Sequence, residues 1–276
     1  MTRKEIKIIA IDLDGTLFNA KKEVSEENRR ALERARQKGV KVVITTGRPL
    51  KAIGNLLSNL HLVSDEDYCI TFNGGLVQRT TGEILDKSAL NYEDLKAIHS
   101  YLEPLGLPFD VLSDGIVYSL PSKGNKSLYH TANPLLTFVE VERFEDIPLD
   151  VPYNKVVTVT DEHFLDEQLT KLPEAVYRDY EAFKSREIIF EIMPKGVHKA
   201  SGLAHLCEHL GLTSDNVMAL GDEANDISML EWAGLGVAMA NATDQVKHIA
   251  DKVTTRSNED SGVAEAIEQY VLREED

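Results

Sequence analysis

The feature that most constrains how this chain can fold is an apolar segment near its start, residues 6–11, which ends directly in two acidic residues, Asp12 and Asp14. The segment is rich in isoleucine and therefore predicts a buried strand. A spacing of two puts both acidic side chains on the same side of an extended chain, and Gly15 lets the backbone turn behind them. Ligands of open α/β sheets bind at the carboxyl ends of strands, so the carboxylates are placed for chemistry. Taken alone, the segment is interpreted equally well as a solvated Asp-Gly turn.

The length and composition describe a globular protein. At 276 residues, with 42% hydrophobic and 28% charged residues, the chain is long enough for two domains or for one large α/β domain with an insertion. No apolar stretch has the length of a membrane span, and residues 1–5 do not resemble a signal peptide. Cys69 and Cys207 form no C-x-x-C motif, so two buried thiols in a reducing cytoplasm are expected.

The charge balance argues against a broad nucleic-acid-binding face. The chain has 46 acidic and 30 basic residues, which give a formal net charge of −16 at pH 7, whereas nucleic-acid binding needs a basic stripe. An acidic protein that handles phosphate needs a local source of positive charge, either a metal ion or a well-placed lysine. We therefore expect a small molecule as the partner, and neither nucleic acid nor a membrane.

Strand-like and helix-like segments alternate in both end regions of the chain. A helix is expected to begin after the N-cap Ser25 and to end at Gly39, and a second helix is expected from Pro49 to about Leu60. Short apolar strands are expected at residues 40–45, 69–72, 217–220, 235–239 and 251–255. This alternation predicts the α/β class, with a doubly wound, Rossmann-like parallel sheet as the core.

The middle of the chain has a different texture. Segments 115–119, 155–160 and 186–192 alternate in polarity, as half-exposed antiparallel strands do, and helix-like stretches at 92–103 and 162–171 fall between them. This pattern predicts an inserted α+β domain at residues 86–194, and a core domain formed by residues 1–85 and 195–276.

A second informative segment is Thr45-Thr46-Gly47-Arg48-Pro49, which follows the expected strand at 40–45. A hydroxyl at a strand end, then glycine, then a helix with proline near its start, makes a small anion site, because backbone N–H groups and the helix dipole favour phosphate there. The competing interpretation is a strand-to-helix turn that is merely capped by threonine.

The third segment contains Lys199, which falls in the first turn of a helix expected to run to about Leu210. A lysine is electrostatically unfavourable at that end of a helix. Such a lysine is often solvated, but here it could neutralise a phosphate and nearby acids.

The fourth segment, Gly221-Asp222-Glu223-Ala224-Asn225-Asp226, directly follows the expected strand at 217–220. Acidic residues on a glycine turn at a strand end are typical of a site for a hard cation such as Mg²⁺. A helix start with Asp222 as its N-cap is the alternative interpretation.

Together, the four segments resemble the haloacid dehalogenase superfamily of phosphatases, specifically the Cof-type subfamily with a type IIB cap. Residues 12–17 match the D-x-D-G-T-L motif of that family, and residues 46–49 match its second motif. Lys199 matches the third motif, and residues 221–226 match the fourth, G-D-x-x-N-D. The resemblance covers essentially the whole chain, including the size and position of the insertion.

The resemblance implies a role for each matching residue. Asp12 would be the nucleophile that forms an aspartyl-phosphate, and Asp14 would be the general acid and then the base that activates water. Mg²⁺ would be bound by Asp12, by the backbone carbonyl of Asp14 and by Asp222, with a contribution from Glu223. The phosphoryl oxygens would be bound by Leu13 (through its N–H), Thr46, Gly47, Lys199 and Asn225. Supporting roles would fall to Thr16, Arg48, Asn73 and Asp226. Asp226 would orient Lys199, while Arg48 and Asn73 could either reach the leaving group from the sheet side or have structural roles. His198 is expected only to cap its helix.

The predicted function is a Mg²⁺-dependent phosphatase of small phosphorylated metabolites, with sugar phosphates as the favoured class. A phosphosugar mutase would use the same nucleophile and metal but would return the phosphate to the sugar. A non-catalytic sensor of phosphorylated ligands on the same fold is the other alternative, although the motif acids that such sensors usually lack are present.

Overall fold

The computed structural model describes residues 5–273, which divide into two compact units. The first unit consists of residues 5–47, 55–86 and 198–273 of the described chain, and the second consists of residues 48–54 and 87–197. The expectation of no signal peptide was based on residues 1–5, and residues 1–4 lie outside the described residues.

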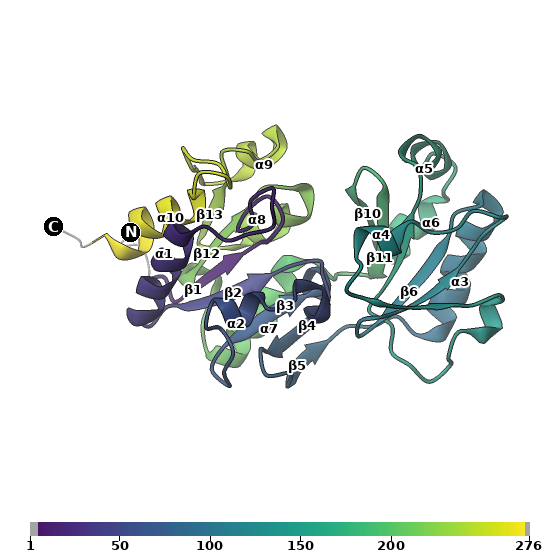
Figure 1. Ribbon diagram of the computed structural model, residues 1–276, viewed down its shortest axis with the longest axis horizontal. Coiled ribbons are helices and arrows are strands. Elements are labelled where there is room, and N and C mark those ends of the chain that lie inside the picture. The colour runs from purple at the N-terminus through teal and green to yellow at the C-terminus, as the bar shows by residue number, and fades with distance from the viewer. Residues whose placement is uncertain (1–4, 274–276) are drawn as a thin grey trace. The chain divides into compact units, whose positions relative to one another are not determined.

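The first unit is built on a sheet with the strand order β14-β13-β12-β1-β2-β3-β4-β5 (Figure 1). The strands from β14 to β3 are parallel to their neighbours, and β4 is antiparallel to β3. The bounds are β1 Ile8–Ile11, β2 Lys41–Thr45, β3 Tyr68–Thr71, β4 Leu76–Arg79, β5 Ile84–Lys87, β12 Val217–Gly221, β13 Leu235–Ala238 and β14 Lys252–Val253. The predicted class, an α/β fold with a parallel sheet, is confirmed.

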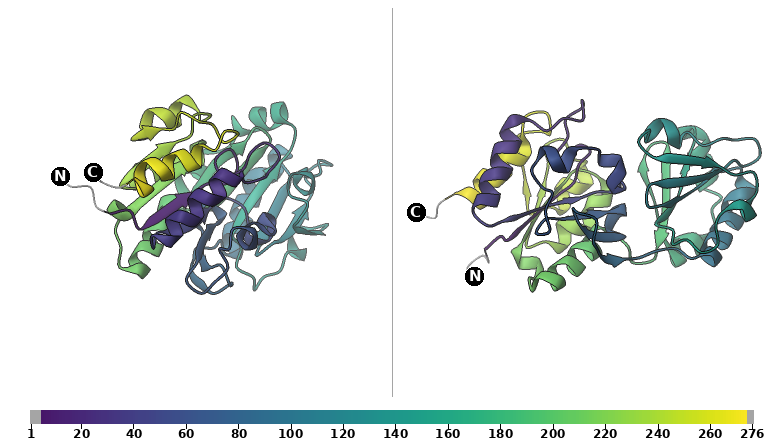
Figure 2. Two further views of the ribbon diagram at one scale, coloured as in Figure 1. Left: turned by 60° about the vertical axis from the view of Figure 1, so that its left-hand side comes forward. Right: turned by 60° about the horizontal axis from the view of Figure 1, so that its bottom comes forward.

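Helices cover both faces of this sheet (Figure 2). α1 and α10 pack against each other on one face, and α7 and α8 pack against each other on the opposite face. The bounds are α1 Glu26–Gln37, α2 Leu56–Asn59, α7 Lys199–Leu210, α8 Ile227–Trp232, α9 Asp244–Ile249 and α10 Gly262–Ile267. The central strands are buried on both faces, which is why β1 reads as an unbroken apolar run.

Local sequence determines where α1 begins and ends. The Ser25 side chain accepts a hydrogen bond from the backbone N–H of Asn28, and Glu26 and Glu27 place negative charge at the positive end of the helix dipole. After α1, the chain leaves the helix at Gly39, which has a φ of +83°. The predicted start and end of this helix are confirmed.

The prediction of one helix from Pro49 to about Leu60 is wrong. The chain forms a 3₁₀ turn at Leu50–Ile53, breaks, and then forms the short helix α2. The break is at Gly54, whose φ of +56° is left-handed and cannot continue a helix. The apolar spacing gave no sign of this break.

The second unit has its own six-stranded sheet, in the order β10-β11-β9-β6-β7-β8. Neighbours are antiparallel except β7 and β8. The strands are β6 Phe109–Ser113, β7 Ile116–Leu120, β8 Thr137–Glu140, β9 Lys155–Val159, β10 Tyr180–Arg186 and β11 Ile189–Pro194. The helices are α3 Tyr92–Leu102, α4 Tyr129–Ala132, α5 Glu162–Leu169 and α6 Glu174–Asp179. Side chains of α3, α5 and α6 form an apolar core with one face of the sheet.

Two predictions about these strands are wrong. The segment 186–192 is not one strand, because β10 ends at Arg186 and β11 begins at Ile189 after a tight turn. β9 is fully buried rather than half-exposed. Its polar residue Lys155 forms a 2.7 Å ion pair with Glu191 of β11, and this partner allows a charged side chain to be buried within the unit.

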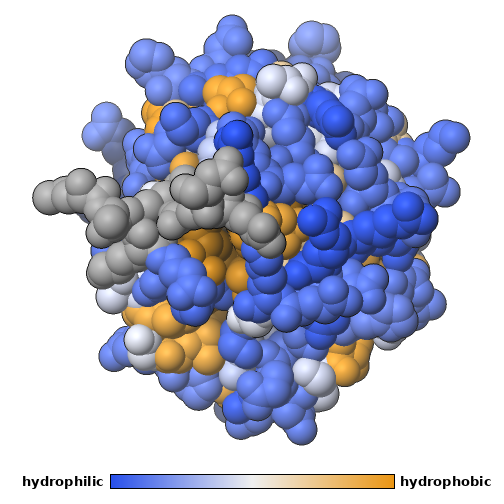
Figure 3. All heavy atoms as spheres, turned by 90° about the vertical axis from the view of Figure 1, so that its left-hand side faces the viewer, coloured by the Kyte–Doolittle hydropathy of each residue, from blue (hydrophilic) through white to orange (hydrophobic). Residues whose placement is uncertain are grey.

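None of the helices formed by residues 5–273 combines the length and apolar character that a membrane crossing requires. Hydrophilic side chains cover most of the face in Figure 3, with smaller apolar patches between them. Cys69 and Cys207 are buried free thiols, as predicted.

Candidate functional site

The carboxyl ends of four neighbouring strands of the first unit lie at one edge of its sheet. β12, β1, β2 and β3 are adjacent and parallel. Asp222 directly follows β12, Asp12 follows β1, and Thr46 follows β2. Asn73 lies in the turn after β3. Residues that are far apart in the sequence are therefore brought to the same edge, where open α/β sheets bind their ligands.

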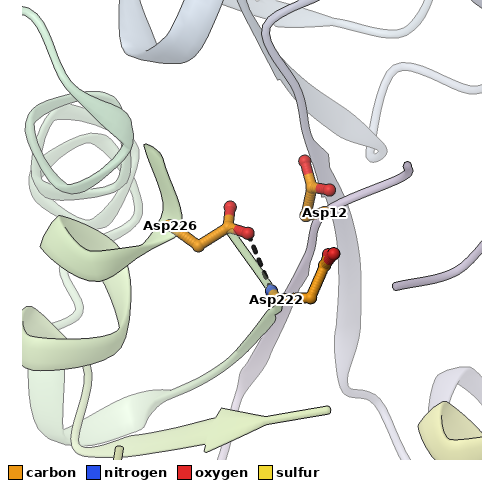
Figure 4. Close-up of side chains that lie close together, drawn as sticks. All are labelled: Asp12, Asp222 and Asp226. Atoms are coloured by element: carbon orange, nitrogen blue, oxygen red, sulfur yellow. Dashed lines mark hydrogen bonds between the residues drawn. The ribbon is translucent and has the colours of Figure 1, made fainter. Parts of the chain in front are cut away.

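Three buried carboxylates, those of Asp12, Asp222 and Asp226, converge at this edge (Figure 4). One oxygen atom of each lies within 4.8 Å of the others. The ammonium group of Lys199, which is completely buried, donates to Oδ1 of Asp12 and, at 2.6 Å, to Oδ1 of Asp226. Lys199 is the first residue of α7, so the start of that helix carries the cation into the cluster.

The loop after β12 holds Asp226 in place. Its Oδ2 accepts hydrogen bonds from the backbone N–H groups of Asp222 at 2.9 Å and of Glu223 at 3.1 Å. Figure 4 shows the first of these bonds. The close fit requires glycine at position 221, since a Cβ there would lie 2.5 Å from the Cβ of Asp226. Lys199 and the loop backbone thus engage both oxygens of Asp226.

Burial and mutual repulsion raise the pKa values of two acids in the cluster. Burial and repulsion from Asp226 raise the pKa of Asp12 to about 7, although Lys199 acts in the opposite direction. Burial and repulsion from Asp12 and Asp226 raise the pKa of Asp222 to about 8. Burial alone would lower the pKa of Lys199, but the two acids that it contacts outweigh burial and raise this pKa above its usual value. One ammonium faces three carboxylates, so the cluster favours a further cation.

The turn after Asp14 fits closely around Asp222. Thr16 is fully buried, and its hydroxyl donates to Oδ1 of Asp222 at 2.6 Å. Gly15 has a φ of +83°, and a Cβ built on it would lie 2.2 Å from Oδ2 of Asp222. Position 15 therefore needs glycine both for its backbone conformation and for the space that Asp222 occupies.

We expect Gly15→Ala to displace the Asp222 carboxylate and to weaken divalent-metal binding by about tenfold or more, because the methyl group and Oδ2 cannot share the same space. The matched control is Gly39→Ala after α1, where φ is also +83° and a Cβ would meet no atom within 4 Å. Both variants carry the backbone strain of a left-handed alanine, about 1 kcal/mol. Calorimetric titration with Mg²⁺ compares the two, and equal affinities would contradict the assignment.

Asn73 and Asn225 connect the turns after β3 and β12. The side-chain amide of Asn225 donates to Oδ1 of Asn73 at 3.2 Å. The backbone N–H of Asn73 donates to the carbonyl of Thr46 at 3.0 Å. Gly47 packs directly on the Asn73 amide, since a Cβ at position 47 would lie 2.9 Å from it.

The remaining predicted residues have varied surroundings. Leu13 is buried, and its carbonyl accepts the N–H of Phe18 at 2.8 Å, while Asp14 is half-buried. The Glu223 side chain is exposed. Arg48 groups with the second unit, and its guanidinium donates to the carbonyl of Ala52 at 3.3 Å. His198 caps α7 as predicted, because its Nδ1 accepts the N–H of Ser201.

Sequence reasoning missed the residues that support the Gly15 turn from the other side of the site. Asn241, three residues after β13, donates from its side chain to the Gly15 carbonyl at 2.8 Å. The N–H of Thr243 donates to the carbonyl of Asp222 at 3.1 Å. Asn258 donates from its amide to the carbonyl of Phe18 and from its backbone to Asn241. An asparagine just beyond a strand end was the only signal in the sequence.

The chain belongs to the haloacid dehalogenase-like hydrolase family, whose model matches residues 9–267. It is 35% identical over 269 residues to the 5-amino-6-(5-phospho-D-ribitylamino)uracil phosphatase YcsE of Bacillus subtilis, covering 97% of both chains. Among solved structures, a haloacid dehalogenase-like hydrolase from Bacteroides thetaiotaomicron superposes with a TM-score of 0.81 at 31% identity, covering 96% of this chain and 99% of that one. The subclass IIB sugar phosphatase BT4131 superposes with a TM-score of 0.79 at 29% identity, covering 97% of this chain and all of that one.

These relatives confirm the predicted family and the predicted class of enzyme, a phosphatase of the haloacid dehalogenase superfamily. The four motifs quoted from the sequence all lie within the matched residues.

Proposed function

We propose that this phosphatase is Mg²⁺-dependent, that it hydrolyses small phosphorylated metabolites with sugar phosphates as the favoured class, and that it acts through an aspartyl-phosphate on Asp12. The observation that carries the proposal is the buried cluster in which Asp12 and Asp226 share the Lys199 ammonium beside Asp222. A carboxylate at a sheet edge next to a buried cation suits attack on a phosphate monoester, because both the nucleophile and a group that neutralises charge are already in place.

The residues present fit a magnesium ion. Lys199 and Thr16 engage Oδ1 of Asp12 and of Asp222, which leaves Oδ2 of both residues for a cation. Mg²⁺ prefers hard oxygen ligands and binds through one or two carboxylates while keeping several waters. We assign Asp12, the Asp14 carbonyl and Asp222 as its ligands. Glu223 is assigned a supporting contribution, through its backbone or through a contact with one of the groups that bind the ion. When bound, Mg²⁺ supplies positive charge that offsets the charge of the transferred phosphoryl group.

The chain's own residues then perform two successive displacements at phosphorus. An oxygen of Asp12 forms a bond to phosphorus as the bond from phosphorus to the ester oxygen breaks, and Asp14 gives its proton to that leaving oxygen. Asp14 next takes a proton from water as the water oxygen attacks phosphorus and the bond to Asp12 breaks. Inorganic phosphate leaves, and both carboxyl groups return to their starting states.

Contacts to the phosphoryl oxygens are assigned to groups around the same sheet edge: the Leu13 N–H, Thr46, Gly47, Lys199 and Asn225. Lys199 neutralises charge, and Asp226 orients it through the 2.6 Å ion pair. The inserted domain, predicted at residues 86–194, is proposed to decide which substrates are accepted. A cytoplasmic location stays a prediction.

Two names support the substrate class. BT4131 is described as a sugar phosphatase, and YcsE is named for a phosphorylated ribitylaminouracil. Both enzyme names refer to small substrates that carry a phosphate on a polyhydroxylated carbon chain. We therefore place sugar phosphates and sugar-alcohol phosphates first among the expected substrates.

Phosphate release from a panel of sugar phosphates, nucleotides and phosphorylated cofactors tests the proposal, with Mg²⁺ or EDTA present. Release that requires Mg²⁺ and is fastest on the sugar phosphates is expected. Isomerised product without free phosphate would point to the mutase alternative, and binding without turnover would point to the sensor. No release from any member of the panel would overturn the proposal.

Metal affinity should increase with pH. The pKa of Asp12 is raised to about 7 and that of Asp222 to about 8, so near neutral pH the metal-free site holds protons that a cation must displace. Between about pH 6 and about pH 9 we expect Mg²⁺ binding to tighten by up to about tenfold per pH unit for each proton released. Calorimetry in two buffers of different ionisation enthalpy counts those protons, and pH-independent binding without proton release would contradict this expectation.

A further inference from the structure

The turn after β3 has an unusual backbone. Phe72, Asn73 and Gly74 have φ values of +51°, +53° and +101°, so three successive residues are in the left-handed region. Such a conformation is costly for a bulky residue such as Phe72 and persists only where the surrounding structure enforces it. Asparagine tolerates it better than most residues that carry a side chain. The position of Asn73 is therefore fixed by its neighbours at the expense of backbone strain.

This turn contacts three segments that carry proposed phosphate ligands. The N–H of Asn73 donates to the Thr46 carbonyl at 3.0 Å, and Oδ1 of Asn73 accepts the Asn225 amide at 3.2 Å. Gly74 lies directly against the start of α7, where a Cβ on it would lie 2.1 Å from the carbonyl of His198, the residue before Lys199. The turn thus contacts the segments that carry the second, third and fourth motifs.

We propose that Asn73 is a positioning residue that orients the Asn225 amide for the phosphoryl group. This inference rests on the proposed function, and it replaces the expectation that Asn73 reaches the leaving group. Asn73 is 2% exposed, and its carboxamide bonds to Asn225 and packs on Gly47. Asn73 therefore acts on the substrate through Asn225.

A double-mutant cycle tests the proposal, with binding of inorganic phosphate in the presence of Mg²⁺ as the first readout and kcat and KM as the second. Asn73→Gly removes the carboxamide but keeps the left-handed backbone accessible, so the variant should fold. Asn225→Ala removes the ligand that Asn73 orients. We expect each single variant to weaken phosphate binding by about 10- to 100-fold, and the double variant to bind as weakly as Asn225→Ala alone.

Asp114→Gly is the matched control, because Asp114 in the β6–β7 turn is another left-handed residue, with a φ of +45°, and is itself exposed. It should leave phosphate binding unchanged. Losses that add in the double variant, an unaffected Asn73→Gly protein, or no phosphate binding by the unchanged protein would each overturn the inference. If the unchanged protein binds phosphate but hydrolyses no ester, the proposed function fails while the binding cycle still decides the role of Asn73.

Discussion

Asp12→Asn should abolish phosphate release, with a loss of at least about 10⁴-fold in kcat, because an amide oxygen is too weak a nucleophile to displace the ester oxygen. Asparagine has the shape of aspartate, and Lys199 keeps its 2.6 Å contact with Asp226. The protein should therefore fold normally. Phosphate release under saturating sugar phosphate and Mg²⁺ is the measurement.

The same variant should also change how stability depends on pH. The pKa of Asp12 is raised, chiefly by burial, to about 7 from an unfolded value near 4. A raised pKa means that the metal-free native state loses stability as pH rises from about 4 to about 7. Asp12→Asn should lack this part of the loss. Thermal unfolding in EDTA across that range tests this expected pH dependence. The same measurement shows whether Asp12→Asn is folded, which the activity test of the nucleophile requires.

Lys199→Met should be the most destabilising single change at the site. The ammonium is completely buried between Asp12 and Asp226, and methionine leaves both carboxylates in a buried site without their shared counter-charge. Removing one partner of a buried ion pair costs about 3–5 kcal/mol of unfolding free energy. Denaturant unfolding in EDTA measures this cost. Phosphate release should fall as well, because the transferred group loses a neutralising cation.

A second substitution separates these two roles of Lys199. Adding Asp226→Asn to Lys199→Met removes one of the stranded carboxylates and should recover part of the lost stability. It should recover no activity, because the cation is still missing. Recovery of phosphate release by the double variant would contradict the assignment of Lys199 to the phosphoryl group.

The parts of the fold that could be predicted from the sequence are those fixed by local patterns. An unbroken apolar run predicts the β1 strand, and Ser25 and Gly39 predict the two ends of α1. Asp12 and Asp222 could be found because each directly follows a strand, and parallel strands bring their carboxyl ends to one edge.

What the sequence left out depends on tertiary contacts. Gly54 breaks the expected helix after Pro49 through a left-handed φ that apolar spacing does not encode. The polar residue Lys155 suggested an exposed strand, but its partner Glu191 lies on another strand and allows burial. The links from Asn73 to Asn225 and from Asn241 to Gly15 join residues more than a hundred positions apart. Such pairs become visible only once the chain is folded.

The most direct test of the account is to trap the phosphorylated enzyme. Protein that is turning over a sugar phosphate with Mg²⁺ is quenched in acid within milliseconds, reduced with borohydride and digested, and the peptides are analysed by mass spectrometry. Borohydride converts an aspartyl-phosphate to homoserine, and we predict homoserine at position 12. Homoserine at another position, or none in protein that releases phosphate, would contradict the account.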